Sequence, residues 1–284
     1  MTVPVHLSVG KLNVDIIVKA DRVPEPDNPF YTDVLTLLPG GAATNYALSV
    51  HRLGHGSKVL AKIGKSPIVK ALMTQLAEEG VGLDYVEEIE TEPSMALIFL
   101  RSDGKISMIR KIASNLIPTA EDVSKMRGMF DVIHFASVPP TSVIYDEGAK
   151  LVTYDPGPYA SEYSGEKVDV IFTNEAEYGR LGSRINARLT VIKRGSKGAT
   201  VLGDGTECEA EAHKVNPVDT TGAGDVFDAA FNVKYSVDEP IEEALRFAIT
   251  ASALKVQRLG GISSPTLEQV TERLKRSSVK VICR

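Results

Sequence analysis

The sequence predicts an α/β fold with a mainly parallel, doubly wound sheet, helices on both faces and a small β-rich lid. Strand-like and helix-like segments alternate along most of the chain, as expected for βαβ units. The strand-like runs are almost continuously apolar, which is typical of parallel strands that are covered on both faces. A proline-rich stretch and a hairpin interrupt this alternation, and we assign both to the lid.

The N-terminal part predicts one strand of the sheet, a lid segment and a helix. The run VHLSVG at 5–10 forms the strand, and apolar character resumes at 16–18 after a short junction. The proline-rich stretch that follows contains an isolated strand at 31–38. Apolar side chains then recur at helical spacing over 42–53, and Gly54 ends this helix.

The next segments continue the alternation and then form a hairpin. The pattern predicts a strand, a helix and a strand at 58–63, 68–79 and 83–88. Two strands at 95–101 and 106–111 flank the sequence SDG, and an Asp-Gly pair favours the turn of a β-hairpin. We therefore expect the lid to consist of about 19–39 and 94–112.

The remaining chain returns to sheet strands and ends in helices. Four apolar strands are predicted at 131–138, 151–158, 168–174 and 189–195. Three helices are predicted at 225–235, 241–259 and 265–274, the last beginning near Ser264 or Thr266. Because there is no internal repeat or linker, we expect a single domain over residues 1–284.

Composition excludes several classes of protein. The 284 residues are 43% hydrophobic and 24% charged, as in ordinary globular proteins. A formal net charge of −5 provides no broad basic surface, so we expect neither a nucleic-acid nor a membrane partner. The N-terminal segment has no basic region before a cleavable apolar run, and no stretch is long enough to span a membrane. We therefore expect a cytoplasmic protein.

Cysteine and histidine spacing supports no metal site. Cys208 and Cys283 lie far apart without a CxxC pattern, so we expect two free thiols and no disulfide. The five histidines show no spacing typical of metal ligands. The GKS at 64–66 is not a P-loop, because Val59 stands where that motif requires its first glycine.

The most informative segment is NPVDTTGAGDVFDAAF at 216–231. Its Gly-Ala-Gly turn precedes a helix, and such a turn exposes backbone N–H groups that bind an anion together with the helix dipole. Asp225 lies in the first helical turn, where its carboxylate can accept a proton from a hydroxyl that attacks a phosphoryl group. A simple tight turn with a helix-capping aspartate would show the same short pattern, and this alternative stays open.

The longer run DTTGAGDVFDAAF at 219–231 resembles the C-terminal signature of the PfkB carbohydrate kinase family, the ribokinase-like sugar and nucleoside kinases. Four further segments carry the same resemblance in the same order: GKLNVDIIV at 10–18, PGGAATNYALSVHRLG at 39–54, NEAE at 174–177 and KRGSKGA at 193–199. The resemblance implies a ribokinase-like fold. It also implies a kinase that transfers a phosphoryl group from ATP or ADP to a hydroxyl of a small sugar, nucleoside or sugar phosphate.

The resemblance implies a role for each matching residue. The catalytic group would be Gly222, Ala223, Gly224 and Asp225, with Asp225 as the base. Substrate contacts would come from Asn13, Asp15, Gly40, Gly41, Asn45, Asn115 and Asp225. The nucleotide would contact Asn174, Lys193, Gly195, Gly198, Thr221, Gly222 and Gly224. Magnesium would be held through water by Asn174 and Glu177, and a potassium site is suggested at Asp219 and Thr221, near the loop 260–265.

Some of these residues also have purely structural interpretations, which stay open. Asn13 and Asp15 could form a turn after the first strand, and Asn45 could bond a neighbouring carbonyl group. Two segments depart from the family pattern. GKSPIVK at 64–70 lacks an aspartate and a glycine of the family, which weakens any assignment of substrate, and IASN at 112–115 replaces Gly-Ala-Asn.

The acceptor and the assembly are predicted only by class. Asp15 and Asn45 suit the vicinal hydroxyls of ribose, a nucleoside or another small sugar. Arg110 and Lys111 at the end of the lid add the alternative of an acceptor that already carries a phosphate, such as ribose 1-phosphate or fructose 6-phosphate. Open lid strands predict a homodimer through the lid. A catalytically silent regulator that binds a sugar or nucleotide is the alternative to a kinase, and Asp225 argues against it.

Overall fold

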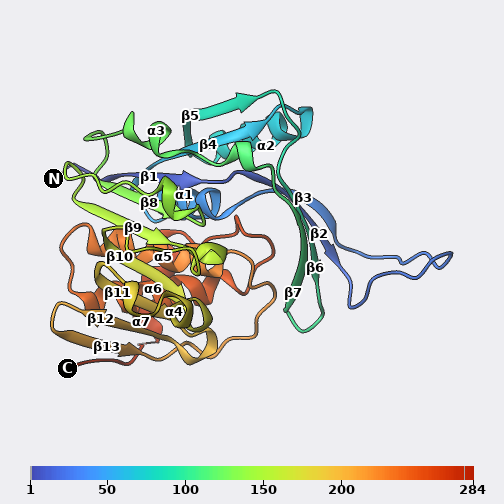
Figure 1. Ribbon diagram of the computed structural model, residues 1–284. Coiled ribbons are helices and arrows are strands. Elements are labelled where there is room, and N and C mark those ends of the chain that lie inside the picture. Colours follow the sequence, from blue (N-terminus) through green and yellow to red (C-terminus); the bar gives the residue numbers. More distant parts are fainter. Residues whose placement is uncertain (1, 278) are drawn as a thin grey trace.

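A 10-stranded sheet forms the centre of the computed structural model, which describes residues 2–277 and 279–284 (Figure 1). In spatial order its strands are β14 (Val281–Cys283), β13 (Thr206–Ala210), β12 (Ala199–Gly203), β11 (Ala187–Lys193), β10 (Val168–Asn174), β9 (Leu151–Asp155), β8 (Val132–Ala136), β1 (Val5–Gly10), β4 (Gly56–Gly64) and β5 (Gly82–Ile89). All neighbours from β5 to β11 are parallel, whereas β12, β13 and β14 continue the sheet antiparallel at one edge. The prediction of a mainly parallel α/β sheet is confirmed.

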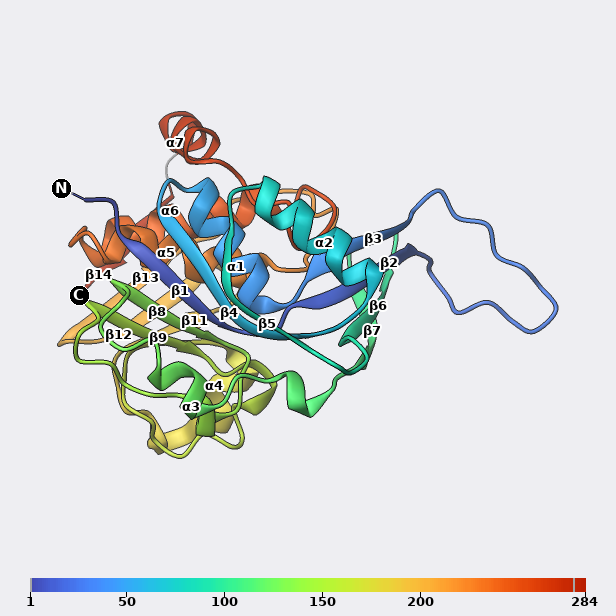
Figure 2. The same ribbon diagram turned by 90° about the horizontal axis from the view of Figure 1, so that it is seen from above.

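Helices cover both faces of this sheet. They are α1 (Ala42–Arg52), α2 (Pro67–Glu78), α3 (Ala120–Ser124), α4 (Glu175–Leu181), α5 (Ala223–Tyr235), α6 (Ile241–Lys255) and α7 (Leu267–Arg276). Figure 2 shows α1, α2, α5, α6 and α7 on one side of the sheet and α3 and α4 on the other. Among the helices of the described residues, none has the length and apolar character that a membrane crossing requires.

Apolar side chains fill the space on both faces of the sheet. On one face, Tyr46 of α1 and Phe231 of α5 pack against the strands from β8 to β13. On the other face, Tyr154 and Tyr163 belong to a second buried cluster. Burial on both faces explains why the parallel strands are apolar along nearly their whole length.

A separate four-stranded sheet lies beside the large one, in the order β3 (Leu35–Gly40), β2 (Asn13–Lys19), β6 (Met95–Leu100) and β7 (Ile106–Lys111) (Figure 1). The strand β2 lies outside the predicted lid segments, so Asn13 and Asp15 are strand residues of the small sheet and not a junction. The strand predicted at 31–38 begins only at Leu35. Residues 21–34 form a long, largely exposed loop that projects away from the molecule.

Side chains of the small sheet alternate between two faces. The inner face lines a cavity with residues that include Asp15, Ala96, Ile98, Met108 and Arg110. The opposite face, here called the outer lid face, carries Ile16, Val18, Leu35, Leu37, Leu97, Phe99 and Ile109, all exposed or half-buried. The small sheet therefore has one face toward the cavity and one apolar face that is partly open to solvent, with Ile16 packed against the main core.

The order of the strands predicts where ligands bind. The chain moves from β1 to β4 and β5 in one direction and to β8 and β9 in the other, so the winding reverses between β1 and β8. Ligands of doubly wound sheets bind beyond the carboxyl ends of the strands at such a point. Lys11 follows β1 and Ser137 follows β8, and both line the cavity under the small sheet.

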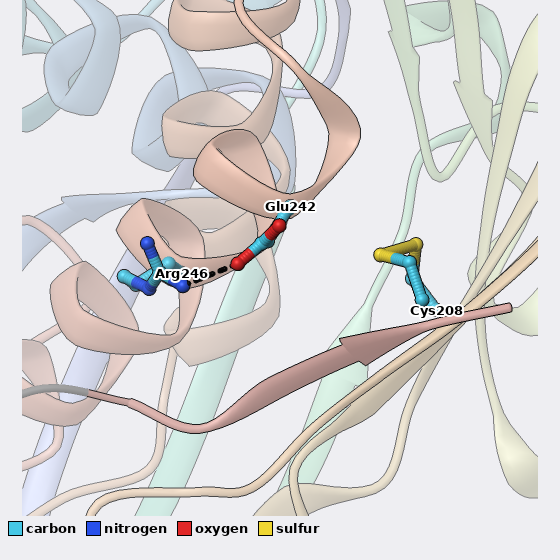
Figure 3. Close-up of a disulfide and its surroundings, with 4 residues drawn as sticks. Cys208, Glu242 and Arg246 are labelled. Atoms are coloured by element: carbon cyan, nitrogen blue, oxygen red, sulfur yellow. Dashed lines mark hydrogen bonds and ion pairs between the residues drawn. A yellow bond between two sulfur atoms is a disulfide. The ribbon is translucent and has the colours of Figure 1, made fainter.

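Cys208 and Cys283 form a disulfide bond, so the expectation of two free thiols is wrong. The bond joins β13 to β14, where the two cysteines are directly paired in the antiparallel register (Figure 3). On α6, Arg246 binds Glu242 at 2.6 Å and donates to the carbonyl of Val279, just before β14. The pairing depends on three edge strands that the sequence pattern did not predict.

Candidate active site

The turn before α5 presents unpaired backbone amides. Gly222 adopts φ 75° and ψ 4°, and α5 begins at the next residue. No described residue accepts a hydrogen bond from the amides of Gly222, Gly224 or Asp225, whereas Val226 already donates to the carbonyl of Gly222 at 3.0 Å. These free donors coincide with the positive end of a 13-residue helix. The predicted anion site therefore has the required geometry.

Two cavities meet at this turn. The lid cavity, of about 280 Å³, lies between the small sheet and the turn and is lined by Asp15, Asn45 and Asp225 among others. The helix cavity, of about 310 Å³, lies beside α5 and α6. Thr220 and Gly224 line both cavities, whereas Asp225 lines only the lid cavity. An anion at the turn can thus be reached from both sides.

Residues that line the lid cavity carry buried oxygen atoms that lack partners. The amide of Asn45 donates to Asp225 through Nδ2, at 2.7 Å from Oδ2. Within the part of the chain that the structure describes, Oδ1 of Asn45, Oδ1 of Asn13 and Oγ1 of Thr221 are buried without a hydrogen bond. Buried polar atoms are normally paired, so these three oxygen atoms suit a ligand that donates hydrogen bonds, such as a sugar with several hydroxyls.

Two carboxyl groups of the lid cavity have raised pKa values. Burial raises the pKa of Asp225 to about 6, although the hydrogen bond from Asn45 opposes the shift. Burial also raises the pKa of Asp15 to about 7, against the opposing charge of Arg110. A carboxylate whose pKa lies close to neutral suits the role of a general base, so Asp225 is the base candidate by position and by chemistry.

Two basic side chains lie at the same cavity. Lys11 is almost completely buried, and its Nζ lies 5.2 Å from the ring centroid of Tyr159. Burial and the nearby charge of Arg110 lower the pKa of Lys11 to about 8. Neither basic group has an ion-pair partner among the described residues. Arg110 was predicted as a substrate contact, whereas Lys11 was not among the predicted site residues.

A buried cluster of charges lies beneath the turn. Nζ of Lys193 is 2.7 Å from Oδ2 of Asp155 and 2.9 Å from both carboxylate oxygens of Asp228. Burial alone would lower the pKa of Lys193, but the two carboxylates outweigh it and raise this pKa. The sequence analysis did not predict Asp155 and Asp228 as site residues. The only signals were that Asp155 is the polar end of a strand and that Asp228 lies one helical turn after Asp225.

The helix cavity is lined by apolar side chains and by a glycine-containing loop. Phe227, Ile249 and Val256 contribute apolar side chains, and Lys193, Gly195 and Gly198 also line the cavity. Gly198 has φ 97°, and a Cβ atom there would lie 1.9 Å from the carbonyl of Ala210. A mainly apolar cavity beside a glycine loop suits the base of a nucleotide.

Other predicted residues lie around the cavities in different ways. Gly41 lines the lid cavity, and Gly40 packs against Asp15, since a Cβ atom would lie 2.0 Å from Oδ2 of that residue. Gly222 lines the lid cavity and Ala223 lines the helix cavity. Asn115 lies on an exposed 3-10 turn and lines neither cavity.

The predicted magnesium residues cap a helix. Asn174 and Glu177 form a capping box of α4, with Oδ1 of Asn174 at 2.9 Å from the amide of Glu177 and Oε2 of Glu177 at 2.8 Å from the amide of Asn174. Among the described residues, no three metal-ligating side chains come together. Burial and the charge of Asp155 raise the pKa of Glu177. One oxygen of Glu177 remains for a water-mediated ion, which suits Mg²⁺ because this ion keeps several waters and takes substrate phosphates as ligands.

Comparisons with known proteins show the family of this chain. The model of the pfkB family of carbohydrate kinases matches residues 6–268. The ATP-dependent ribose-1-phosphate kinase of Halopiger xanaduensis is 28% identical and aligns over 93% of this chain and 96% of its own. The structure of Arabidopsis thaliana ribokinase with ribose and ATP has a TM-score of 0.81 at 26% identity, covering 98% of this chain and 100% of that chain. This chain is a phosphotransferase with an alcohol group as acceptor, and it belongs to the pfkB family of carbohydrate kinases.

Proposed function

We propose that this kinase transfers the γ-phosphoryl group of ATP to a hydroxyl of a small sugar that already carries a phosphate. The observation that carries the proposal is the position of Thr220 and Gly224 between the two cavities. A nucleotide in the helix cavity would extend its phosphates to the turn, and an acceptor in the lid cavity would have a hydroxyl beside Asp225. Such positioning supplies much of the catalysis in phosphoryl transfer.

The chemistry would proceed by in-line displacement. Asp225 would take the proton of the acceptor hydroxyl as that oxygen bonds to the γ-phosphorus, and the bond to the bridging oxygen would break to release ADP. The free amides of Gly222 and Gly224 would stabilise the charge on the transferring group. Glu177 would hold Mg²⁺ through water, and the ion would supply positive charge at the phosphates.

The lid cavity supports a hydroxyl-rich, anionic acceptor. The unpaired oxygens of Asn13 and Asn45 would accept hydrogen bonds from ring hydroxyls. Lys11 and Arg110 have no ion-pair partner among the described residues and would bind a phosphate group at the other end of the acceptor. The relative from Halopiger xanaduensis that acts on ribose 1-phosphate supports this class. We also propose a cytoplasmic location, since ATP and a phosphorylated acceptor are compounds of the cytoplasm.

We further propose that two copies of the chain associate through the outer lid face. Leu35, Leu37 and Ile109 on this face are 70%, 46% and 63% exposed. Apolar patches of this kind are rare on the free surface of a monomer and mark contact surfaces. A second copy of the same face is self-complementary in a twofold dimer, which would cover both apolar surfaces at once.

The acceptor is tested by direct detection of the product. Ribose, nucleosides, ribose 1-phosphate and fructose 6-phosphate would be incubated with Mg²⁺ and either ATP or ADP, and products would be identified by mass spectrometry. We expect efficient transfer from ATP to a sugar phosphate and a loss of at least about 10²-fold in Asp225→Asn. Asp33→Asn, an exchange on the exposed loop, is the matched control.

Different outcomes would separate the parts of this proposal. Preference for free ribose or a nucleoside over the phosphorylated acceptors would overturn the role of Lys11 and Arg110 but keep the kinase. Efficient use of ADP would overturn only the choice of donor. Binding of ligands by folded protein without transfer to any acceptor would favour the catalytically silent regulator.

A further inference from the structure

Lys255 places a buried charge beside the turn at residues 220–224 before α5, here called the anion turn. It is the last residue of α6 and is 0% exposed. Its Nζ donates to the backbone carbonyl of Asp219 at 2.9 Å. Burial of an ammonium group is costly unless it is hydrogen-bonded and balanced by nearby negative charge. Asp219 and Asp225 supply this negative charge.

The same position is where the resemblance suggests a potassium ion. A bare potassium ion needs several oxygen atoms to replace its hydration shell. The oxygens of Asp219 are already used by the protein, because Oδ1 accepts from the amide of Thr221 and Oδ2 from the amide of Gly260, both at 2.8 Å. The carbonyl oxygen of Asp219 accepts from Lys255. A potassium ion at this carbonyl would also lie next to the like charge of Lys255, so Asp219 does not fit it. Oγ1 of Thr221 is buried without a partner among the described residues, but one hydroxyl oxygen by itself does not replace a hydration shell.

Three carbonyls of the loop 260–265 also accept hydrogen bonds from the protein, whereas Oγ of Ser264 is buried without a partner among the described residues. Nη1 of Arg52 donates to the carbonyls of Ile262 and Ser264 at 3.1 and 2.9 Å. The carbonyl of Gly260 accepts from both the amide and the hydroxyl of Ser263. The guanidinium group of Arg52 therefore binds two loop carbonyls that would otherwise be free to bind an ion.

The end of α6 and the following loop also contact the backbone of the anion turn and of the residues before it. The amides of Val218 and Asp219 both donate to the carbonyl of Val256, at 2.7 and 3.1 Å. Gly261 packs so closely on Gly222 that a Cβ atom at Gly222 would lie 3.0 Å from it. The end of α6 and the following loop thus fix the segment that positions the free amides, and the charge of Lys255 adds positive potential near Asp225.

We propose that the Lys255 ammonium replaces a bound monovalent cation in this protein, so that phosphoryl transfer needs no potassium. The proposal rests on the proposed kinase function for its activity assays. Lys255 acts as a positioning residue, because it reaches the reacting groups only through Asp219 and the anion turn.

The test compares cations and variants. Rates would be measured with the best acceptor in tetramethylammonium buffer, with potassium, ammonium or sodium chloride added at equal ionic strength. We expect the wild type to respond by less than twofold, the same in each salt. Lys255→Met should lower kcat by about 10–10²-fold, less than the loss of a direct oxyanion donor. Lys255→Ala should show a similar loss, with severalfold recovery in potassium or ammonium but not in tetramethylammonium.

A second readout does not depend on activity. Potassium should raise the thermal midpoint of Lys255→Ala above its value in tetramethylammonium and should leave the wild type unchanged. Lys275→Met, the same exchange at an exposed lysine of α7, controls for the loss of a positive charge.

Three results would overturn the proposal: severalfold activation of the wild type by potassium, a potassium-dependent rise in its thermal midpoint, or full activity of Lys255→Met. If neither variant folds, the two wild-type measurements still decide. A wild type without activity on any acceptor would instead count against the proposed function, and its thermal midpoint would still test the cation.

Discussion

Nδ2 of Asn45 on α1 lies 2.7 Å from Oδ2 of Asp225 on α5, across 180 residues of sequence. The hydrogen bond favours the ionised carboxylate, whereas burial favours the neutral form. Burial has the larger effect, and the pKa of Asp225 is raised to about 6. The carboxylate is therefore ionised at neutral pH but basic enough to take up a proton during the reaction.

This pairing predicts the pH dependence of the rate. Because the base acts when deprotonated, kcat of the wild type should rise with pH through about 6 and then level off. Asn45→Ala removes a bond that lowers the pKa of Asp225, so its midpoint should move to higher pH. The measurement is a pH profile of kcat at saturating acceptor. An unshifted midpoint in Asn45→Ala would contradict the role of the bond.

The backbone of the anion turn predicts a selective loss of activity. Gly222 has φ 75°, and an added Cβ atom would lie 3.1 Å from Nδ2 of Asn45. Gly222→Ala should lower kcat by roughly 10²-fold, because the free amides would move away from the transferring group. Gly205→Ala is the matched control, since Gly205 has φ 70° with no neighbour within 4 Å. Both variants should lose about 1–2 kcal/mol of stability in denaturant unfolding, and only the first should lose activity. Equal activity of the two would show that the turn does not need its glycine.

A buried histidine predicts a loss of stability in acid. Nδ1 of His134 lies 2.8 Å from Oγ1 of Thr153, its ring stacks on Tyr46, and burial lowers its pKa to about 3. Below about pH 6.5 the unfolded chain binds a proton that the folded chain does not, so the free energy of unfolding should fall between about pH 6.5 and 3. The raised pKa values of Asp15 and Asp225 act in the opposite direction, and only a comparison of variants isolates the histidine.

His134→Gln is that comparison. Its free energy of unfolding should decline less steeply than that of the wild type from pH 6.5 downward, by up to about 1.4 kcal/mol for each step of one in pH. Above about pH 7.5 the two proteins should show parallel curves, because neither the folded nor the unfolded histidine then binds a proton. Urea unfolding at a series of pH values measures this, and parallel curves throughout would exclude a titrating role for His134.

The outer lid face predicts the state of assembly. Ile109 is 63% exposed on β7, directly opposite Leu97 of β6. Ile109→Lys would bury a charge in any contact through this face, so the dimer should dissociate with little change in thermal midpoint. Val237→Lys changes an exposed apolar residue outside the lid and should leave the mass unchanged. Sedimentation equilibrium reports the mass, and a dimeric Ile109→Lys or a monomeric wild type would rule out this contact.

The local pattern of apolar residues was sufficient to predict the strands that are buried on both faces. The strand predicted at 168–174 has those bounds in the structure, because burial on both faces leaves a continuous apolar run. The anion turn could be predicted because its glycines and the start of the following helix lie in one segment of the sequence. The pairing of Lys193 with Asp155 and Asp228 could not be predicted, since it joins three separate elements of the chain. Edge strands such as β13 mix polar and apolar residues, so their pairing depends on the rest of the sheet.

The disulfide between Cys208 and Cys283, which the sequence analysis did not predict, should contribute to the stability of the fold. Cys208 and Cys283 are 75 residues apart, and the closed loop includes α5, α6 and α7. A cross-link of this length restricts the unfolded chain, so Cys283→Ser should lower the free energy of unfolding by about 2–5 kcal/mol. Ile282→Ala, in the same strand but without loss of the cross-link, should lose less.

Reduction provides the independent check. Thiol titration of the denatured wild type should find no free cysteine, and dithiothreitol should lower its thermal midpoint to that of Cys283→Ser without affecting the variant. Disulfides are rare in the cytoplasm of mesophiles but occur in hyperthermophiles, so protein purified from its own organism is the material to use. If its two thiols titrate freely and dithiothreitol changes nothing, β14 is held by Arg246 and backbone pairing alone.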